Sequence, residues 1–185
     1  MPVGPAFPIS NGMKNIGIKN HKPQIYIGSD HAGFVMKEHL IPFLKEKGYE
    51  VFDCGAFKYD DSDDYPDFIA PVAKAVSLNP ENIRGIILGG SGQGEAIVAN
   101  RFPNVRAMVF YGTAGVWKSE KAMIQLGRRH NDSNILSLGA RMINLNEAKF
   151  AVEVWLETNF SNIERHIRRI KKLEKVSKEA ICQHF

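Results

Sequence analysis

The sequence predicts an α/β protein with a parallel, doubly wound sheet and helices on both faces of that sheet. Short β-branched or apolar runs alternate along the chain with longer amphipathic stretches. This alternation is typical of βαβ units, in which each crossover helix packs on a sheet of parallel strands. No repeat or linker interrupts it, and 185 residues suffice for one full-sized core. We therefore expect a single domain over residues 23–180.

Three strands and two helices are expected in the first half of the chain. In order, they are a strand at 24–28, a helix at 33–47, a strand at 49–54, a helix near 66–77 and a strand at 84–88. The first helix is predicted from apolar residues at helical spacing, and Gly48 ends it. The acidic segment that precedes the second helix lacks the glycine and distal glutamate of a calcium loop. We interpret it as a solvated turn.

The second half continues the same rhythm. We expect a helix at 95–101, a strand at 105–111, a helix at 119–128, a strand at 134–138 and helices near 145–157 and 162–180. The strands therefore form a five-stranded parallel sheet. Ligands bind such sheets beyond the carboxyl ends of the strands, so the residues that directly follow a strand are the first candidates for a site.

Composition indicates an ordinary globular protein, with 44% hydrophobic and 24% charged residues and a formal net charge of +4. No apolar run approaches the ~20 residues of a membrane span. The basic residues come without an aromatic-rich surface, so we expect neither a membrane nor a nucleic-acid partner. Residues 1–22 hold several Pro and Gly and should form a flexible extension. Cys54 and Cys182 fit no disulfide or metal pattern, which favours the cytoplasm and predicts no metal site.

A glycine-rich loop follows the third predicted strand. Four of its six residues are glycine, which lets the backbone approach a ligand without Cβ collisions. The loop consists of Gly89, Gly90, Ser91, Gly92, Gln93 and Gly94. It opens a helix, and its free N–H groups can therefore bind an anion or a developing oxyanion. The loop matches neither the dinucleotide fingerprint nor a P-loop, so its pattern does not predict a nucleotide site.

Glu95 comes directly after this loop, in the first turn of the next helix. The helix dipole by itself favours a carboxylate in the first turn of a helix, and this is the structural explanation that requires no function. The functional explanation is that a base is tethered beside oxyanion donors. Burial in a closed site would favour its protonated form, and the helix N-terminus would oppose this.

Other polar residues lie near the predicted strand ends. Asp30 and His31 follow the first strand, Tyr111 ends the fourth, and Arg141 follows the fifth. One of the residues after the first strand should cap the next helix. The fifth strand is preceded by His130, Asn131 and Asp132, whose polar side chains could hold a sugar hydroxyl or ring oxygen. A lone histidine is more often structural, so this segment alone does not define a site.

Arg165, Arg169 and Lys172 recur at helical spacing and share one face of the last helix. A solvated basic face explains such a run as well as a ligand does. Two arginines one turn apart would suit bidentate donation to a phosphate.

Six motifs occur in order across residues 24–170. They are Gly28-Ser29-Asp30-His31-Ala32-Gly33, Asp64-Tyr65-Pro66-Asp67-Phe68, the loop from Gly89 to Glu95, His130-Asn131-Asp132, Leu138-Gly139-Ala140-Arg141 and Arg165-His166-Ile167-Arg168-Arg169. Together they resemble the ribose-5-phosphate isomerase B family. The resemblance implies a Rossmann-like three-layer α/β/α sandwich, no cofactor, and a homodimer or dimer of dimers with active sites at the dimer interface.

Two positions depart from the common family pattern. Many members carry a cysteine base where this chain has Gly89, and the chain instead resembles the branch in which a glutamate, here Glu95, is the base. Many members also place a ring-opening histidine where this chain has Tyr111. The resemblance then implies His130 as the proton donor, with His31 as its competitor. The segment 112–129 is also longer than usual.

The resemblance further implies which residues bind substrate. These are Asp30, His31, Gly90, Ser91, Gly92, Gln93, Gly94, Asn131 and Arg141. Arg165 and Arg169 are expected to bind the phosphate in the site of the partner subunit, because the C-terminal helix at 162–180 is expected to reach that subunit. The expected activity is interconversion of ribose 5-phosphate and ribulose 5-phosphate through a cis-enediolate in the pentose phosphate pathway. The alternatives are an isomerase of galactose 6-phosphate or allose 6-phosphate, a non-catalytic sugar-phosphate or nucleotide sensor, and a flavin-binding protein.

Overall fold

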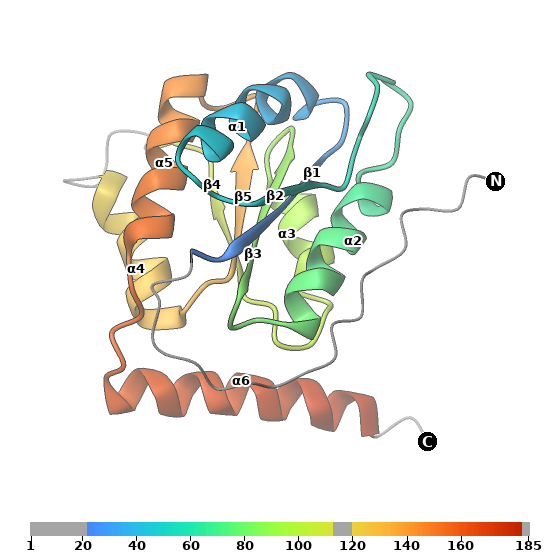
Figure 1. Ribbon diagram of the computed structural model, residues 1–185. Coiled ribbons are helices and arrows are strands. Elements are labelled where there is room, and N and C mark those ends of the chain that lie inside the picture. Colours follow the sequence, from blue (N-terminus) through green and yellow to red (C-terminus); the bar gives the residue numbers. More distant parts are fainter. Residues whose placement is uncertain (1–21, 113–119, 183–185) are drawn as a thin grey trace.

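The computed structural model describes residues 22–112 and 120–182, which form one sheet with helices around it (Figure 1). The elements are β1 (Gln24–Ser29), α1 (Phe34–Glu46), β2 (Val51–Asp53), α2 (Tyr65–Leu78), β3 (Ile83–Gly89), α3 (Gln93–Ala99), β4 (Ala107–Phe110), α4 (Glu120–Asn131), β5 (Ile135–Gly139), α5 (Leu145–Glu157) and α6 (Glu164–Cys182). The expected extension at 1–22, except for Lys22, and residues 113–119 of the long segment lie outside this description.

All five strands are parallel, in the order β2-β1-β3-β5-β4. The predicted five-stranded α/β sheet is thereby confirmed. The chain steps from β1 outward to β2, crosses back to β3, and then reaches β4 before returning to β5 between them. Because every strand points the same way, all of the loops that leave the strands meet at one edge of the sheet.

Helices cover both faces of the sheet, as the alternation predicted (Figure 1). On one face, α1, α4 and α5 pack over a core that includes Ile86, Leu88 and Trp155. On the other face, α2 and α3 pack over a second core that includes Ile87 and Val72. Neighbouring residues of β3 thus enter opposite cores, as the period of two in a strand requires. Within the described residues, none of the helices combines the length and apolar character needed to cross a membrane.

Helix α6 does not belong to either layer. It crosses below the sheet, at the edge where the strands begin (Figure 1). Its contacts with α4 hold it there: the backbone N–H of Ser161, just before α6, donates to the Arg129 carbonyl at 3.1 Å, and the rings of His130 and His166 lie together.

Strand β4 is an edge of the sheet, and a side chain partly covers it. The Asn100 amide accepts a hydrogen bond from the Ala107 N–H at 2.8 Å and donates to the Ala107 carbonyl at 3.2 Å. Asn100 therefore takes the place that a neighbouring strand would occupy at this residue.

Among the helices near the predicted site, α4 has different bounds from those expected. The helix was expected to end at residue 128, but it continues to Asn131 and includes His130. An ion pair of 2.8 Å between Arg128 and Asp132, four residues apart, spans the last turn, and Asp132 then ends the helix with a positive φ of 45°. His130 and Asn131 are thus carried on a helix rather than on a loop.

Candidate active site

The carboxyl ends of β1, β3 and β5 lie side by side in the middle of the sheet. Ser29 is in register with Leu88, and Gly89 is in register with Gly139. Beyond the strands, the Ala140 N–H donates to the Gly89 carbonyl at 2.8 Å and the Arg141 N–H to the Gly90 carbonyl at 3.1 Å. Residues far apart in the sequence therefore meet at this edge, as expected for a parallel sheet.

The glycine-rich loop turns tightly from β3 into α3. Gly92 has a φ of +77° and precedes the first turn of the helix, a conformation that other residues seldom adopt. Its carbonyl accepts a hydrogen bond of 2.6 Å from Ser137 Oγ on β5, which anchors the loop. Ser91 and Gln93 are exposed, so the outer side of the loop is open to a ligand.

Glu95 lies buried just behind this loop, with 4% of its surface exposed. Its carboxylate occupies the space next to Gly89, where a Cβ would overlap the Glu95 Oε1 and Cδ atoms. A side chain at position 89 and this conformation of Glu95 therefore exclude each other. Burial raises the pKa of Glu95 above its ordinary value, and the negative charge of Asp30 adds to this effect. A carboxylate in these surroundings has an increased affinity for a proton.

Asp30 and His31 directly follow β1, and Asp30 is close enough to Glu95 for its charge to act on that carboxyl. Asp30 Oδ1 accepts hydrogen bonds from the Ala32 and Gly33 N–H groups at 2.9 and 3.2 Å, so Asp30 caps the turn that precedes α1. The predicted helix cap is not formed, because the N-cap of α1 is Gly33, which makes no side-chain cap hydrogen bond. The His31 ring is held by Asp63, whose Oδ1 lies 2.7 Å from Nδ1 and also accepts the His31 backbone N–H at 3.1 Å. The hydrogen bond to Asp63 is the main cause that raises the pKa of His31.

The role of Asp63 was missed in the sequence. The acidic segment was interpreted as a solvated turn, yet only 8% of the Asp63 side chain is exposed. The remainder of the segment is mostly exposed as expected, including Asp61 and Ser62. Only the folded loop brings Asp63 to His31, thirty-two positions earlier, so no local pattern singled it out from its acidic neighbours.

The same group of residues is the best arrangement for a metal ion among the described residues. Ligand atoms of Asp30, His31 and Asp63 lie within 4.8 Å of one another. However, His31 Nδ1 is already paired with Asp63, and its Nε2 faces the Arg141 guanidinium at 3.5 Å. A cation bound to Nε2 would be repelled by this guanidinium. With Nε2 protonated, the two side chains present donors together, an arrangement that suits an anion.

Replacing Asp63 with Asn should lower the pKa of His31, because the charged partner of the imidazolium is lost. In the parent, the raised pKa keeps His31 protonated throughout the range below its ordinary value of 6.5, and the stabilising pair is lost as the pH rises through the raised value. The variant should lose the proton at lower pH. NMR titration of the ring measures this, with Asp61→Asn as the matched control, and an unchanged His31 pKa in Asp63→Asn would contradict the pairing.

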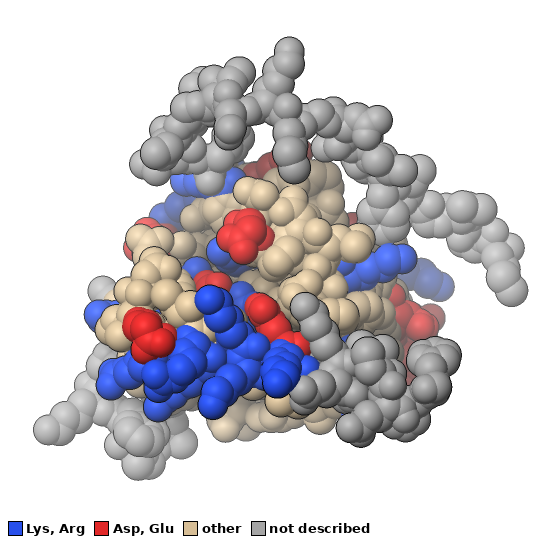
Figure 2. All heavy atoms as spheres, turned by 90° about the horizontal axis from the view of Figure 1, so that it is seen from below, with Lys and Arg blue, Asp and Glu red and all other residues tan. Residues whose placement is uncertain are grey.

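The remaining predicted site residues lie at the opposite edge of the sheet. His130 and Asn131 end α4 just before β5 begins, and Arg165 and Arg169 are exposed on α6 below the sheet. Lys and Arg side chains gather on this lower face (Figure 2). Within one chain, the structure does not bring these four residues to Glu95. The sequence contained a signal for this, since residues that precede a strand lie at its amino end.

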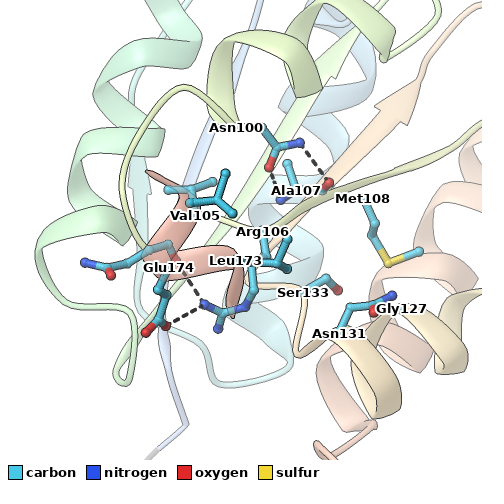
Figure 3. A pocket seen from close by; sticks show the side chains of 12 residues that line it. Asn100, Val105, Arg106, Ala107, Met108, Gly127, Asn131, Ser133, Leu173 and Glu174 are labelled. Carbon is cyan, nitrogen blue, oxygen red and sulfur yellow. Dashed lines mark hydrogen bonds and ion pairs between the residues drawn. The ribbon is translucent and has the colours of Figure 1, made fainter. Parts of the chain in front are cut away.

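Asn131 instead lines a cavity of about 410 Å³ between α6 and the start of β4 (Figure 3). Arg106 extends across this cavity towards Glu174, from which it is separated by 4.0 Å, and also pairs with Asp132 at 2.8 Å. The charges in this cavity are therefore paired. It lies away from the glycine-rich loop, and Glu95 is not among its lining residues.

At the carboxyl ends of the strands, this α/β protein brings together a buried carboxylate, the amides of the glycine-rich loop and two basic side chains. Such an arrangement is suited to proton transfer on a small anionic ligand. Residues 25–173 match the family model described as ribose/galactose isomerase. The chain belongs to the ribose/galactose isomerase family. This confirms the resemblance of the six motifs.

Known relatives and solved structures agree with this assignment. The chain is 42% identical over 147 residues to ribose-5-phosphate isomerase B of Mycolicibacterium paratuberculosis, covering 80% of this chain and 87% of the relative. It is 37% identical to the Escherichia coli enzyme of the same name, over 81% and 93% of the two chains. The crystal structure of ribose-5-phosphate isomerase B from Mycoplasma genitalium, with bound ribulose-5-phosphate, superposes with a TM-score of 0.77 at 34% identity, over 84% and 97% of the chains.

Proposed function

We propose that this protein interconverts ribose 5-phosphate and ribulose 5-phosphate through an enediolate, with Glu95 as the base. The observation that carries the proposal is the buried Glu95 carboxylate over Gly89, directly behind the glycine-rich loop. An aldose–ketose isomerase needs one base next to donors that stabilise two oxygen atoms. The names of the relatives and the ribulose-5-phosphate bound to the Mycoplasma genitalium protein support this substrate.

In the proposed mechanism, Glu95 removes the proton from C2 of the open-chain aldose. The C–H electron pair forms the C1–C2 double bond of the enediolate while the C1 carbonyl pair moves onto O1. The proton on Glu95, which exchanges in part with water, is then delivered to C1, and the O2 hydroxyl proton passes to O1 as the C2 carbonyl forms. Backbone N–H groups of residues 90–94 stabilise the developing oxygen charge, with Ser91 near O1 or O2. Removing one such donor typically costs about 3–4 kcal/mol of barrier. His130 or His31, with Asp30, assists ring opening, and Asn131 and Gln93 contact the sugar.

The phosphate is held by basic residues from both edges of the sheet. Arg141 lies next to Gly90 and 3.5 Å from His31, at the upper edge. Arg165 and Arg169 lie on α6, at the lower edge. Because these two groups of arginines lie at opposite edges of the sheet, one chain cannot place both against the same small sugar phosphate. We therefore propose a homodimer, or a dimer of dimers, in which one copy supplies Arg165 and Arg169 from α6, and His130 from α4, to the site of the other.

We also propose a cytoplasmic location. Cys54 is a free thiol whose pKa is raised to about 12, chiefly by burial, so it packs in the protein and is a poor nucleophile. The absence of a disulfide framework from the sequence fits a reducing compartment.

The proposed reaction is tested by assaying the purified protein on five- and six-carbon sugar phosphates. We expect kcat/KM to be highest for ribose 5-phosphate, lower for galactose 6-phosphate and allose 6-phosphate, and deuterium from heavy water to enter recovered substrate at C2. A higher kcat/KM on a six-carbon phosphate would transfer the assignment to that substrate. Binding without deuterium incorporation would instead indicate a sensor.

A further inference from the structure

His166 contacts both Arg165 and His130, the phosphate-binding arginine and the ring-opening histidine that the amino edge of the sheet would contribute to a site. It follows Arg165 in the first turn of α6, and only 1% of its surface is exposed. Its ring lies 4.4 Å from the ring of His130, measured between centroids, with an interplanar angle of 38°. Its Nε2 lies 3.2 Å from Arg165 Nε, and its Nδ1 lies 2.7 Å from Ser161 Oγ.

These contacts determine the protonation state of His166. An arginine side chain can only donate hydrogen bonds, so His166 Nε2 must accept the bond from Arg165 Nε. The ring is then neutral, and its proton lies on Nδ1, which donates to Ser161 Oγ. Ser161 is fixed in turn, since its backbone N–H donates to the Arg129 carbonyl on α4 at 3.1 Å. The tautomer therefore follows from the partners of the ring.

The consequence for Arg165 is geometric. Its bond to His166 uses Nε and does not use the two Nη groups, so the guanidinium is oriented while its outer donors remain for a ligand. A planar guanidinium held this way can offer paired donors to a phosphate without losing orientational freedom on binding.

We propose that His166 is a positioning residue, a neutral buried imidazole that orients the Arg165 guanidinium through Nε2 and the His130 ring through the tilted contact between the two rings. This rests on the proposed function, in which Arg165 binds phosphate, and on His130 rather than His31 as the residue that assists ring opening. His166, which would not contact the substrate itself, thereby orients Arg165 and His130, which would. The same contacts join α6 to α4.

The surroundings of the ring agree with a neutral state. Burial lowers the pKa of His166, and the positive or potentially positive groups that face it lower the pKa further: His130 from α4, and Arg165 and Arg169 from α6. The backbone of Arg129 opposes them. His166 should therefore stay neutral to a pH below its ordinary value of 6.5.

Two substitutions separate the two contacts. His166→Phe keeps a ring against His130 but cannot accept from Arg165, so KM for ribose 5-phosphate should rise about tenfold with kcat within about twofold of the parent. His166→Gln keeps an acceptor but not the ring, so kcat should fall more than KM rises. In an Arg165→Met background, His166→Phe should raise KM no further. Thermal unfolding verifies that each variant folds, and Arg168→Gln, at an exposed position of the same helix, is the control.

Equal effects of Phe and Gln on both parameters would overturn the proposal, as would an undiminished effect of His166→Phe in the Arg165→Met background. A second readout does not depend on activity. Nitrogen-15 NMR of the parent should show His166 as the neutral Nδ1–H tautomer at pH 7, and an Nε2–H tautomer or a charged ring would also overturn the proposal. If the parent lacks isomerase activity, the proposed function fails, and the spectrum still decides the state of His166.

Discussion

The Glu95→Gln variant should lose isomerase activity by about 10²–10⁴-fold, the usual contribution of a positioned general base. Glutamine keeps the shape of the side chain and fits the same space over Gly89, but it cannot take a proton from C2. The measurement is kcat/KM on ribose 5-phosphate. Glu46→Gln, at the end of α1, is the matched control with the same chemical change at an exposed position.

The same substitution should raise stability at neutral pH. A carboxyl whose pKa is raised by folding costs the protein stability as the pH rises from its ordinary value of 4.5 through the raised value. Glutamine removes this cost, so the melting temperature should increase as activity falls. The parent's own activity should decline as the pH drops through the raised pKa of Glu95. A Glu95→Gln enzyme that works at close to the parental rate would end the assignment of Glu95 as the base.

A heterodimer that carries Glu95→Gln on one copy and Arg165→Met with Arg169→Met on the other should regain activity. If α6 of each copy serves the other copy's site, one of the two sites in this trans heterodimer is intact. We expect about half of the parental activity per dimer, although each homodimer of the variants is nearly inactive. Tandem affinity tags on the two copies isolate the mixed species.

The control uses the same three substitutions on one copy, paired with a parental copy. In this cis heterodimer both shared sites are damaged, so activity should be as low as in the variant homodimers. If all site residues belonged to one chain, the result would reverse: the cis heterodimer would keep half of the activity and the trans heterodimer almost none. Such a reversal would refute the shared site.

Much of the fold follows from local patterns in the sequence. Helix α5 has the expected bounds, and its start is fixed by a capping box between Asn144 and Glu147. The five strands were also expected, because buried parallel strands are short apolar runs. Strands β2 and β4 are shorter than expected, at three and four residues. Both are edges of the sheet, where pairing on one side only supports fewer residues.

The candidate site was predictable in part. Gly92 and Glu95 were identified because four glycines at a strand end have few structural explanations. Asp63 was missed because its contact with His31 depends on the path of a loop. The position of His130 at the amino end of β5 was implied by its place just before that strand, whereas its assignment to the site came from the resemblance of its motif to the family. Contacts such as that between His130 and His166 join two helices, and no spacing within either helix predicts them.

The amide of Asn100 has a consequence for how copies of this protein can associate. A bare strand edge is a template on which further strands can add without limit, which leads to fibres. Asn100 satisfies both backbone groups of Ala107 on β4, and so closes that edge at this point. The proposed dimer would then form without adding a strand at this point of β4. In the proposed dimer, in which each site needs residues from a neighbouring copy, this contact would oppose the uncontrolled addition of further copies at β4.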